Sequence, residues 1–174
     1  AAGLVARVPD LLEPLLEQPP VLPRQLVTTG IGTSEGHARH LAEVAARFAG
    51  QPARFAVTGS LEAGAPAGSE QDWLVVFSQG LSANARFALG DVEAWGGVVL
   101  ISGLPRSGTT GFEALPADKQ AWLRELEARG VVQIELGCDA EYGLLIRVLG
   151  ARLGYAVGAC CGRWQPVGWR RFPG

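Results

Sequence analysis

Short apolar segments, rich in branched residues, alternate along this chain with longer segments in which apolar residues recur at helical spacing. The short segments predict strands at 25–29, 54–57, 73–77, 98–101 and 131–134. The longer segments predict helices at 34–49, 83–95, 116–129 and 140–153, with a short helix at 4–17 before them. Residues 58–69, after the second strand, predict a loop with a helical turn near Glu62. The chain is therefore predicted to be a helix followed by five strand–helix units.

The third and fourth predicted strands have no polar face. Residues 73–77 (Trp-Leu-Val-Val-Phe) and 98–101 (Val-Val-Leu-Ile) are apolar at every position, which is typical of parallel strands covered by helices on both sides. The alternation predicts a three-layer α/β/α domain of the flavodoxin-like kind, with a five-stranded parallel sheet in the order 2-1-3-4-5. We expect this domain over residues 24–158, after an N-terminal helix and proline-rich connector at 1–23 and before an aromatic and basic tail at 159–174.

Composition narrows the classes of protein that fit. With 174 residues, 48% of them hydrophobic and 18% charged, the chain has enough apolar material for one domain with a core. A net charge of -2 gives no electrostatic reason to expect a nucleic acid or a membrane surface as partner. Cys138, Cys160 and Cys161 have neither a disulfide framework nor metal-ligand spacing. We therefore expect a cytoplasmic protein with no metal and no cofactor.

Two polar loops follow the first and third predicted strands. Open parallel sheets bind ligands beyond the carboxyl ends of the strands where the strand order reverses, which here is between these two strands. Residues 30–36 and 78–84 supply hydroxyl and amide groups, and each loop precedes a helix whose first N–H groups are free. This combination predicts a site for a phosphate or a ring of hydroxyls. The alternative is that the serines, threonines and asparagine only cap helices.

Four motifs in the same order carry a resemblance to a known family. Residues 32–34 (Gly-Thr-Ser) resemble the "G-T-S" turn of the sugar isomerase (SIS) family, and residues 60–62 (Ser-Leu-Glu) resemble its "S-E" segment. Residues 77–80 (Phe-Ser-Gln-Gly) resemble the start of its "S-Q-S-G-E-T" phosphate loop, and residues 140–143 (Ala-Glu-Tyr-Gly) resemble its "T-E-I-G" segment. The resemblance covers about residues 24–153.

The resemblance implies a sugar or phosphosugar ligand, an aldose–ketose isomerase or related sugar enzyme, and a homodimer. Members of the family include phosphosugar isomerases, the isomerase half of glucosamine-6-phosphate synthase and sugar-sensing regulators. The phosphate loop departs from the pattern, because Gly80, Leu81, Ser82 and Ala83 replace the family's serine, glycine, glutamate and threonine. Phosphorylation of the ligand is therefore left open. The implied binding residues are Gly32, Thr33, Ser34, Ser78, Gln79, Gly80, Ser82 and Asn84.

Candidates for proton transfer are few. Isomerisation needs a base that moves a proton between neighbouring carbons, and Glu62 and Glu141 are the best placed, although either could instead be a structural glutamate at a helix start. His37 and His40 lie one turn apart on the first helix, where surface histidines are the ordinary case. Lys119, the single lysine, is predicted to face solvent on a distant helix.

Three alternatives remain open from the sequence. Residues 30–36 have the spacing G-x-G-x-x-x-G of a dinucleotide loop, but Val57 and Thr58 stand where an acidic residue would bind the ribose, which disfavours a nicotinamide cofactor. Residues 107–110 form a polar loop that either borders the site or is plain surface. The third alternative to an enzyme is a non-catalytic sugar-binding or sensor module, or one half of a tandem protein. The hydroxyls missing from the phosphate loop favour this alternative.

Overall fold

The structure of the chain is a computed structural model that describes residues 23–48, 50–61 and 69–135. In this part of the chain, five parallel strands form one sheet in the order β2-β1-β3-β4-β5. The strands are β1 (Gln25–Gly30), β2 (Ala53–Phe55), β3 (Asp72–Phe77), β4 (Gly97–Ser102) and β5 (Val132–Glu135). The predicted fold class and strand order are confirmed.

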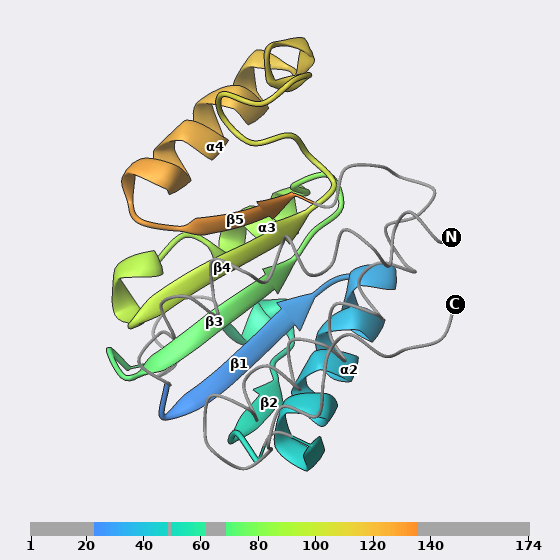
Figure 1. Ribbon diagram of the computed structural model, residues 1–174, viewed down its shortest axis with the longest axis vertical. Helices are drawn as coiled ribbons and strands as arrows, with labels where there is room; N and C mark the ends of the chain where they lie inside the picture. The colour runs from blue at the N-terminus through green and yellow to red at the C-terminus, as the bar shows by residue number, and fades with distance from the viewer. Residues whose placement is uncertain (1–22, 49, 62–68, 136–174) are drawn as a thin grey trace, which may run out of the picture.

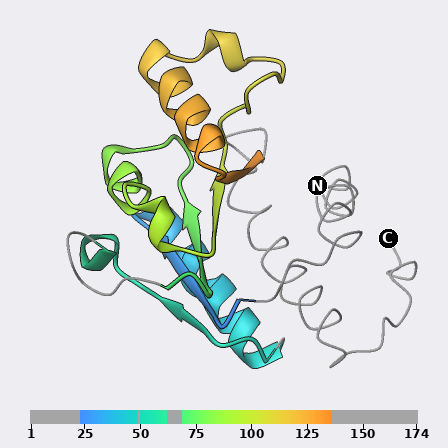
Figure 2. The ribbon, with the colours of Figure 1, turned by 90° about the vertical axis from the view of Figure 1, so that its left-hand side faces the viewer.

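Helices cover both faces of the sheet. Helix α2 (Thr33–Phe48) lies on one face, and α3 (Ala83–Ala88) and α4 (Ala117–Ala128) lie on the other, as Figures 1 and 2 show. Short 3-10 helices connect the larger elements, namely η1 (Thr58–Leu61), η2 (Val92–Ala94) and η3 (Phe112–Ala114). None of the helices in the described ranges is long and apolar enough to cross a membrane.

The predicted helix at 83–95 is wrong in its second half. Helix α3 ends at Ala88, where Leu89 donates its N–H to the carbonyls of Ala85 and Arg86, and η2 then covers Val92–Ala94. Gly90 explains the break, because glycine is among the least favourable residues in a helix interior. The helices predicted at 4–17 and 140–153 lie outside the described residues.

Alternate residues of β3 enter two separate cores. Leu74 and Val76 pack with residues of α3 and α4, whereas Val75 and Phe77 pack with residues of α2. All four side chains are almost completely buried, and burial of each contributes about 1.5–3 kcal/mol. The uninterrupted apolar strand in the sequence thus corresponds to a central strand covered on both sides.

Strand register places the loops of the predicted site side by side. Gln25 of β1 pairs with Asp72 of β3 at one end, and Gly30 pairs with Phe77 at the other. At the first end Arg24 donates two hydrogen bonds to Asp72, at 3.1 and 2.9 Å, and this guanidinium lowers the pKa of the buried Asp72 carboxyl. Because β1 and β3 end level with each other, the loops that follow them start as neighbours.

Candidate functional site

The turn after β1 depends on two glycines. A Cβ on Gly30 would lie 2.6 Å from the carbonyl oxygen of Ser34, so glycine lets the first turn of α2 approach the strand. Gly32 has a φ of +64°, in the left-handed region that glycine adopts without strain. Thr28 adds a hydrogen bond of 2.7 Å from its hydroxyl to the carbonyl of Ala38, which fixes α2 on β1. These contacts place Ser34 directly over the end of the strand.

A small cavity lies between the ends of β1 and β3, at the point where the strand order reverses. Its volume of about 20 Å³ is enough for one water-sized group. It is lined by Gly30, Ile31, Ser34, Thr58, Val76, Phe77, Ser78, Ser82 and Ala85. None of these side chains carries a charge, so the polar character of the cavity comes from four hydroxyl groups.

Ser34 presents an unsatisfied hydroxyl to this cavity. Its side chain is only 5% exposed, and no described residue forms a hydrogen bond with its hydroxyl. The residue belongs to the first turn of a 16-residue helix, where the helix dipole favours negative charge. Among the described residues, Arg86 Nε is the buried side-chain atom that lacks a partner; the Ser34 oxygen is instead open to the cavity, where a ligand oxygen can bond to it.

The hydroxyls of the loop after β3 are partly committed to the loop itself. Ser78 accepts a hydrogen bond of 3.3 Å from the backbone N–H of Ser82, and Ser82 in turn accepts one of 3.4 Å from Ala85 as the N-cap of α3. The backbone carbonyl of Gln79 accepts from the N–H of Gly103 and ties the loop to the end of β4. The Ser78 hydroxyl keeps its own proton, which it can donate into the cavity.

Leu81 adopts a conformation that its residue type does not predict. It is the one described residue other than glycine with a positive φ, at 53°, and its side chain is 1% exposed. A left-handed conformation costs a leucine roughly 1–2 kcal/mol, which burial of the side chain offsets. Leu81 stands where the resemblance places a glycine, so the loop keeps a glycine-like backbone without the glycine.

The remaining predicted binding residues surround the cavity without lining it. Gly32 and Thr33 are exposed at the start of α2, Asn84 is exposed on α3, and Gln79 and Gly80 are half-buried in the loop after β3. Glu62 and Glu141, the candidates for proton transfer, lie outside the described residues. The sequence analysis missed Thr58 and Ile31, although Thr58 follows the second strand and so could have been assigned to the same edge of the sheet.

Two predictions about titratable side chains are wrong. His37 is 6% exposed rather than on the surface, with its ring centroid 6.5 Å from that of Phe77. Lys119 is half-buried rather than solvent-facing, and its ammonium lies 3.8 Å from the position that a Cβ on Gly80 would take. The helix that carries Lys119 is distant in sequence, but its first turn starts at the same edge of the sheet.

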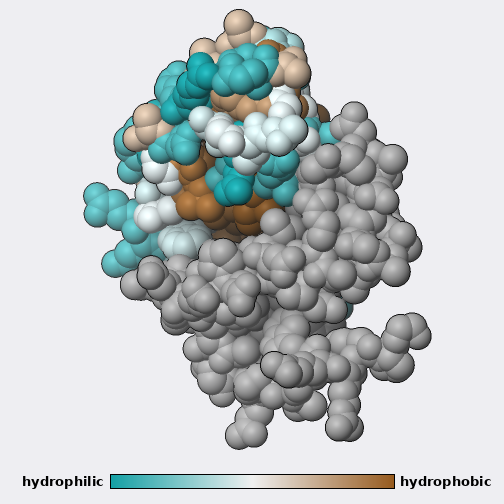
Figure 3. Space-filling view, turned by 45° about the horizontal axis from the view of Figure 1, so that its top comes forward, coloured by the Kyte–Doolittle hydropathy of each residue, from teal (hydrophilic) through white to brown (hydrophobic). Residues whose placement is uncertain are grey.

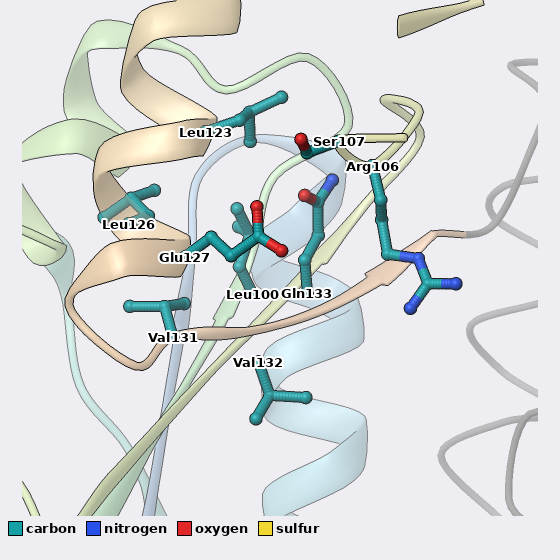
Figure 4. Close-up of a pocket in the computed structure, with 9 residues that line it drawn as sticks. All are labelled: Leu100, Arg106, Ser107, Leu123, Leu126, Glu127, Val131, Val132 and Gln133. Carbon is teal, nitrogen blue, oxygen red and sulfur yellow. The ribbon is translucent and has the colours of Figure 1, made fainter. Parts of the chain in front are cut away.

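A larger cavity of about 210 Å³ lies elsewhere, between α4 and the adjacent strands β4 and β5. Leu123 and Leu126 line one side of it, and the carboxylate of Glu127 and the amide of Gln133 lie near its centre (Figure 4). Gln133 is already committed, because its amide donates to Ser102 and to the carbonyl of Leu104, both at 3.1 Å. We place the ligand site at the smaller cavity, where a hydroxyl lacks a partner.

Hydrophobic residues also show at the centre of one face of the molecule, with hydrophilic ones above them (Figure 3).

Comparison with known proteins gives a fold and no sequence relative. No family model and no curated protein matches the chain. An E. coli CFT073 protein solved in complex with a sugar phosphate superposes with a TM-score of 0.66 at 16% identity, over 94% of this chain and 87% of that one. A Methanococcus jannaschii protein, for which the function of a 3-hexulose-6-phosphate isomerase was inferred from its structure, superposes with a TM-score of 0.59 at 12% identity. The match covers 94% of this chain and 89% of that one. The chain has the SIS fold.

A third structure with the SIS fold is the C-terminal domain of glucosamine-fructose-6-phosphate aminotransferase from Francisella tularensis. It matches with a TM-score of 0.63 at 10% identity, over 94% of this chain. This chain spans about half of that one, 48% of its length. The agreement in fold, with identities this low, shows that the pattern of strands and helices persists where most residues differ.

Proposed function

We propose that this SIS domain binds a sugar or a phosphosugar at the cavity between the ends of β1 and β3. The observation that carries the proposal is the hydroxyl of Ser34, which has no partner among the described residues and lines a polar cavity at the first turn of α2. The fold supports the proposal, because one structure that shares it was solved with a sugar phosphate and another infers a hexulose-phosphate isomerase.

The cavity holds one oxygen of the ligand, and the rest of the ligand lies above it. Ser34, Thr58 and Ser78 supply hydroxyls around a space of water size, which suits a single phosphate oxygen or sugar hydroxyl. The N–H groups of Ser34 and Glu35 are already bonded to the carbonyls of Ile31 and Gly32, at 3.2 and 3.1 Å, so the start of α2 contributes its dipole, which favours an anion, rather than free N–H donors. Gly32, Thr33, Gln79 and Asn84 then form the rim along which the sugar extends.

The favoured activity is aldose–ketose isomerisation. A base removes a proton from the carbon next to the carbonyl group, and the same proton or another returns to the neighbouring carbon as the carbonyl shifts. We assign proton transfer to Glu62 and Glu141, the carboxylates that the resemblance brings to this edge of the sheet. Replacement of Glu141 by Gln is expected to abolish turnover while binding persists.

A non-catalytic sugar sensor is the second candidate. The observation that favours it is that none of the nine residues around the described cavity has an ionisable side chain suited to proton transfer. The sensor is favoured if the wild-type chain binds pentose, hexose or heptose phosphates but turns none of them over.

A homodimer remains part of the proposal. The resemblance supports it, and Phe87 on α3 (59% exposed) and Val132 on β5 (54% exposed) are apolar side chains that such an interface could cover. Light scattering on the purified chain tests this, and a monomer at all concentrations argues against it.

The Ser34→Ala variant tests the site directly. We expect it to weaken binding of the phosphosugar that the wild type binds best at least tenfold, or by about 1.4 kcal/mol. The melting temperature of the free protein should stay about equal, since the lost hydroxyl has no partner among the described residues. The measurement is a thermal-shift titration of fructose 6-phosphate, arabinose 5-phosphate and sedoheptulose 7-phosphate against the unphosphorylated sugars. A ligand at a hundred times its dissociation constant stabilises the fold by about 2.7 kcal/mol.

Ser60→Ala is the matched control for this variant. Ser60 also lies at the carboxyl edge of the sheet, but it is exposed and its hydroxyl is bound to the carbonyl of Val57 at 2.7 Å. It does not line the cavity. Equal affinities of the Ser34 and Ser60 variants for every sugar contradict the assignment of the site.

A further inference from the structure

The side chain of Lys119 reaches across from α4 to the loop after β3. Its ammonium nitrogen lies 3.8 Å from the position that a Cβ on Gly80 would take, and no other atom outside the neighbouring residues comes within 4 Å of that position. The ammonium therefore occupies the space into which a side chain at position 80 would project. A serine there, as in the loop that this segment resembles, would direct its hydroxyl into the same space.

The location of this cation is unfavourable for the helix that carries it. Lys119 is the third residue of α4, near the positive end of the helix, where a cation is disfavoured. Its charge is not balanced by a neighbour, because no carboxylate of the described ranges forms an ion pair with it and the adjacent Asp118 is bound to Arg86 at 2.7 Å. An anion beside the loop would remove this imbalance.

We propose that Lys119 is a specificity-determining residue for phosphorylated ligands, whose ammonium takes the place of the hydroxyl that Gly80 lacks. This inference rests on the proposed function, because it assigns one more donor to the same ligand. The ammonium donates a hydrogen bond to a phosphate oxygen held at the loop 78–82, and Gly80 keeps the space that the lysine needs. Hydrogen bonds between charged groups are roughly twice as strong as those between neutral groups, so one lysine offsets the loss of neutral donors from the loop.

A charged donor discriminates between ligands in a way that a hydroxyl does not. A serine hydroxyl binds a phosphate oxygen or a sugar hydroxyl, whereas an ammonium strongly favours the phosphate because its charge is opposite. Phosphosugars are therefore expected to bind more tightly than the corresponding free sugars, and the difference should shrink as salt is raised.

The test compares Lys119→Met with wild type in calorimetric titrations of the full chain. The probes are fructose 6-phosphate, fructose and inorganic phosphate, each at low and high salt. We expect the variant to bind fructose 6-phosphate and phosphate about tenfold more weakly or worse, to bind fructose unchanged, and to lose most of the salt dependence. Arg124→Met is the matched control, since it removes another cation of α4 that is paired with Glu113.

A second variant tests the exchange of lysine for serine. In the double variant Gly80→Ser with Lys119→Met, the added Cβ has no backbone atom beyond its chain neighbours within 4 Å, and we expect the serine hydroxyl to restore part of the phosphate affinity with little salt dependence. One outcome overturns this inference and leaves the proposed function in place. In it, the Lys119→Met variant binds fructose 6-phosphate and phosphate as tightly as wild type, whereas the separate Ser34→Ala variant has lost binding. Binding of phosphate but of no sugar, lost in Lys119→Met, supports the lysine subsite and overturns the proposed function instead.

Discussion

The hydroxyl of Thr29, near the end of β1, lies 3.0 Å from the hydroxyl of Thr58, the first residue of η1. Both side chains are buried, with 0% and 5% exposure. The bond joins the strand to the segment that follows the neighbouring strand β2, and it turns Thr58 into part of the cavity wall. A structural hydrogen bond and a candidate ligand contact thus share one residue.

We expect Thr58→Val to lower the free energy of unfolding by about 1–2 kcal/mol, because the Thr29 hydroxyl is left buried without its partner. The same variant should weaken binding of phosphosugar, since one of the four cavity hydroxyls is lost. Urea denaturation measures the first effect and a ligand titration the second. Full stability together with full affinity would show that the pair has neither role.

Gly30→Ala tests the close approach of α2 to the sheet. A Cβ at this position would lie 2.6 and 2.8 Å from the carbonyl oxygen and carbon of Ser34, which are backbone atoms that cannot rotate away. We expect a loss of about 1–3 kcal/mol in the free energy of unfolding. Ligand affinity should also fall, because the first turn of α2 that carries Ser34 has to move.

Gly36→Ala is the matched control, since it adds the same methyl group to the same helix. Nothing lies within 4 Å of the added Cβ, and alanine is more stable than glycine in a helix interior by about 0.5–1 kcal/mol. Its unfolding midpoint should therefore rise. If both variants shift the midpoint in the same direction, steric contact at Gly30 is not the cause.

The fold was predictable because a few patterns suffice to specify it. The uninterrupted apolar residues of β3 require cover on both faces of the sheet. The structure divides them between two cores, with Leu74 and Val76 in one and Val75 and Phe77 in the other. Together with alternating strands and helices, this leaves few arrangements besides a parallel sheet. The loops after β1 and β3 were then predictable as neighbours, and Ser34, Ser78 and Ser82 do line one cavity.

The parts of the site that were not predictable depend on tertiary placement. The sequence shows Lys119 on a helix far from Gly80, and only the start of α4 at the same sheet edge brings the two together. His37 shares a helix with exposed residues, and which face is buried depends on its neighbour Phe77. The left-handed conformation of Leu81 contradicts its residue type, because the loop geometry overrides a local preference.

The conformation of Leu81 predicts an unusual order of variants. Alanine at a buried leucine position is normally more stable than glycine, because glycine gains more freedom on unfolding. At a φ of 53° alanine is strained and glycine is not, so we expect Leu81→Gly to be at least as stable as Leu81→Ala, both below wild type by about 2–5 kcal/mol. Leu89, fully buried with a φ of -96°, is the comparison, and there the alanine variant should be the more stable. The same order at both positions would exclude strain at Leu81.

The ion pair between Glu93 and Arg129 gives a prediction for pH. Arg129 donates hydrogen bonds of 2.7 and 2.6 Å to the two carboxylate oxygens of Glu93, and a third of 2.9 Å to the carbonyl of Gly90. The Arg129 guanidinium lowers the pKa of Glu93 from 4.5 to about 2. Because the folded pKa is depressed, any stability from this pair is present above about pH 4.5 and is lost as pH falls toward 2; the Glu93 side chain is 64% exposed, so solvent screening keeps the effect small.

Arg129→Gln should return the pKa of Glu93 toward its ordinary value, which a carbon-detected NMR titration of the carboxyl group measures directly. Arg124→Gln is the control, since Arg124 pairs with Glu113 instead, and it should leave Glu93 unchanged. Loss of the Gly90 contact in the Arg129 variant should also loosen the end of α4 against the turn before η2, seen as faster amide exchange there. A Glu93 pKa that stays near 2 without Arg129 would mean that backbone N–H groups, rather than the guanidinium, hold this carboxylate in its charged form.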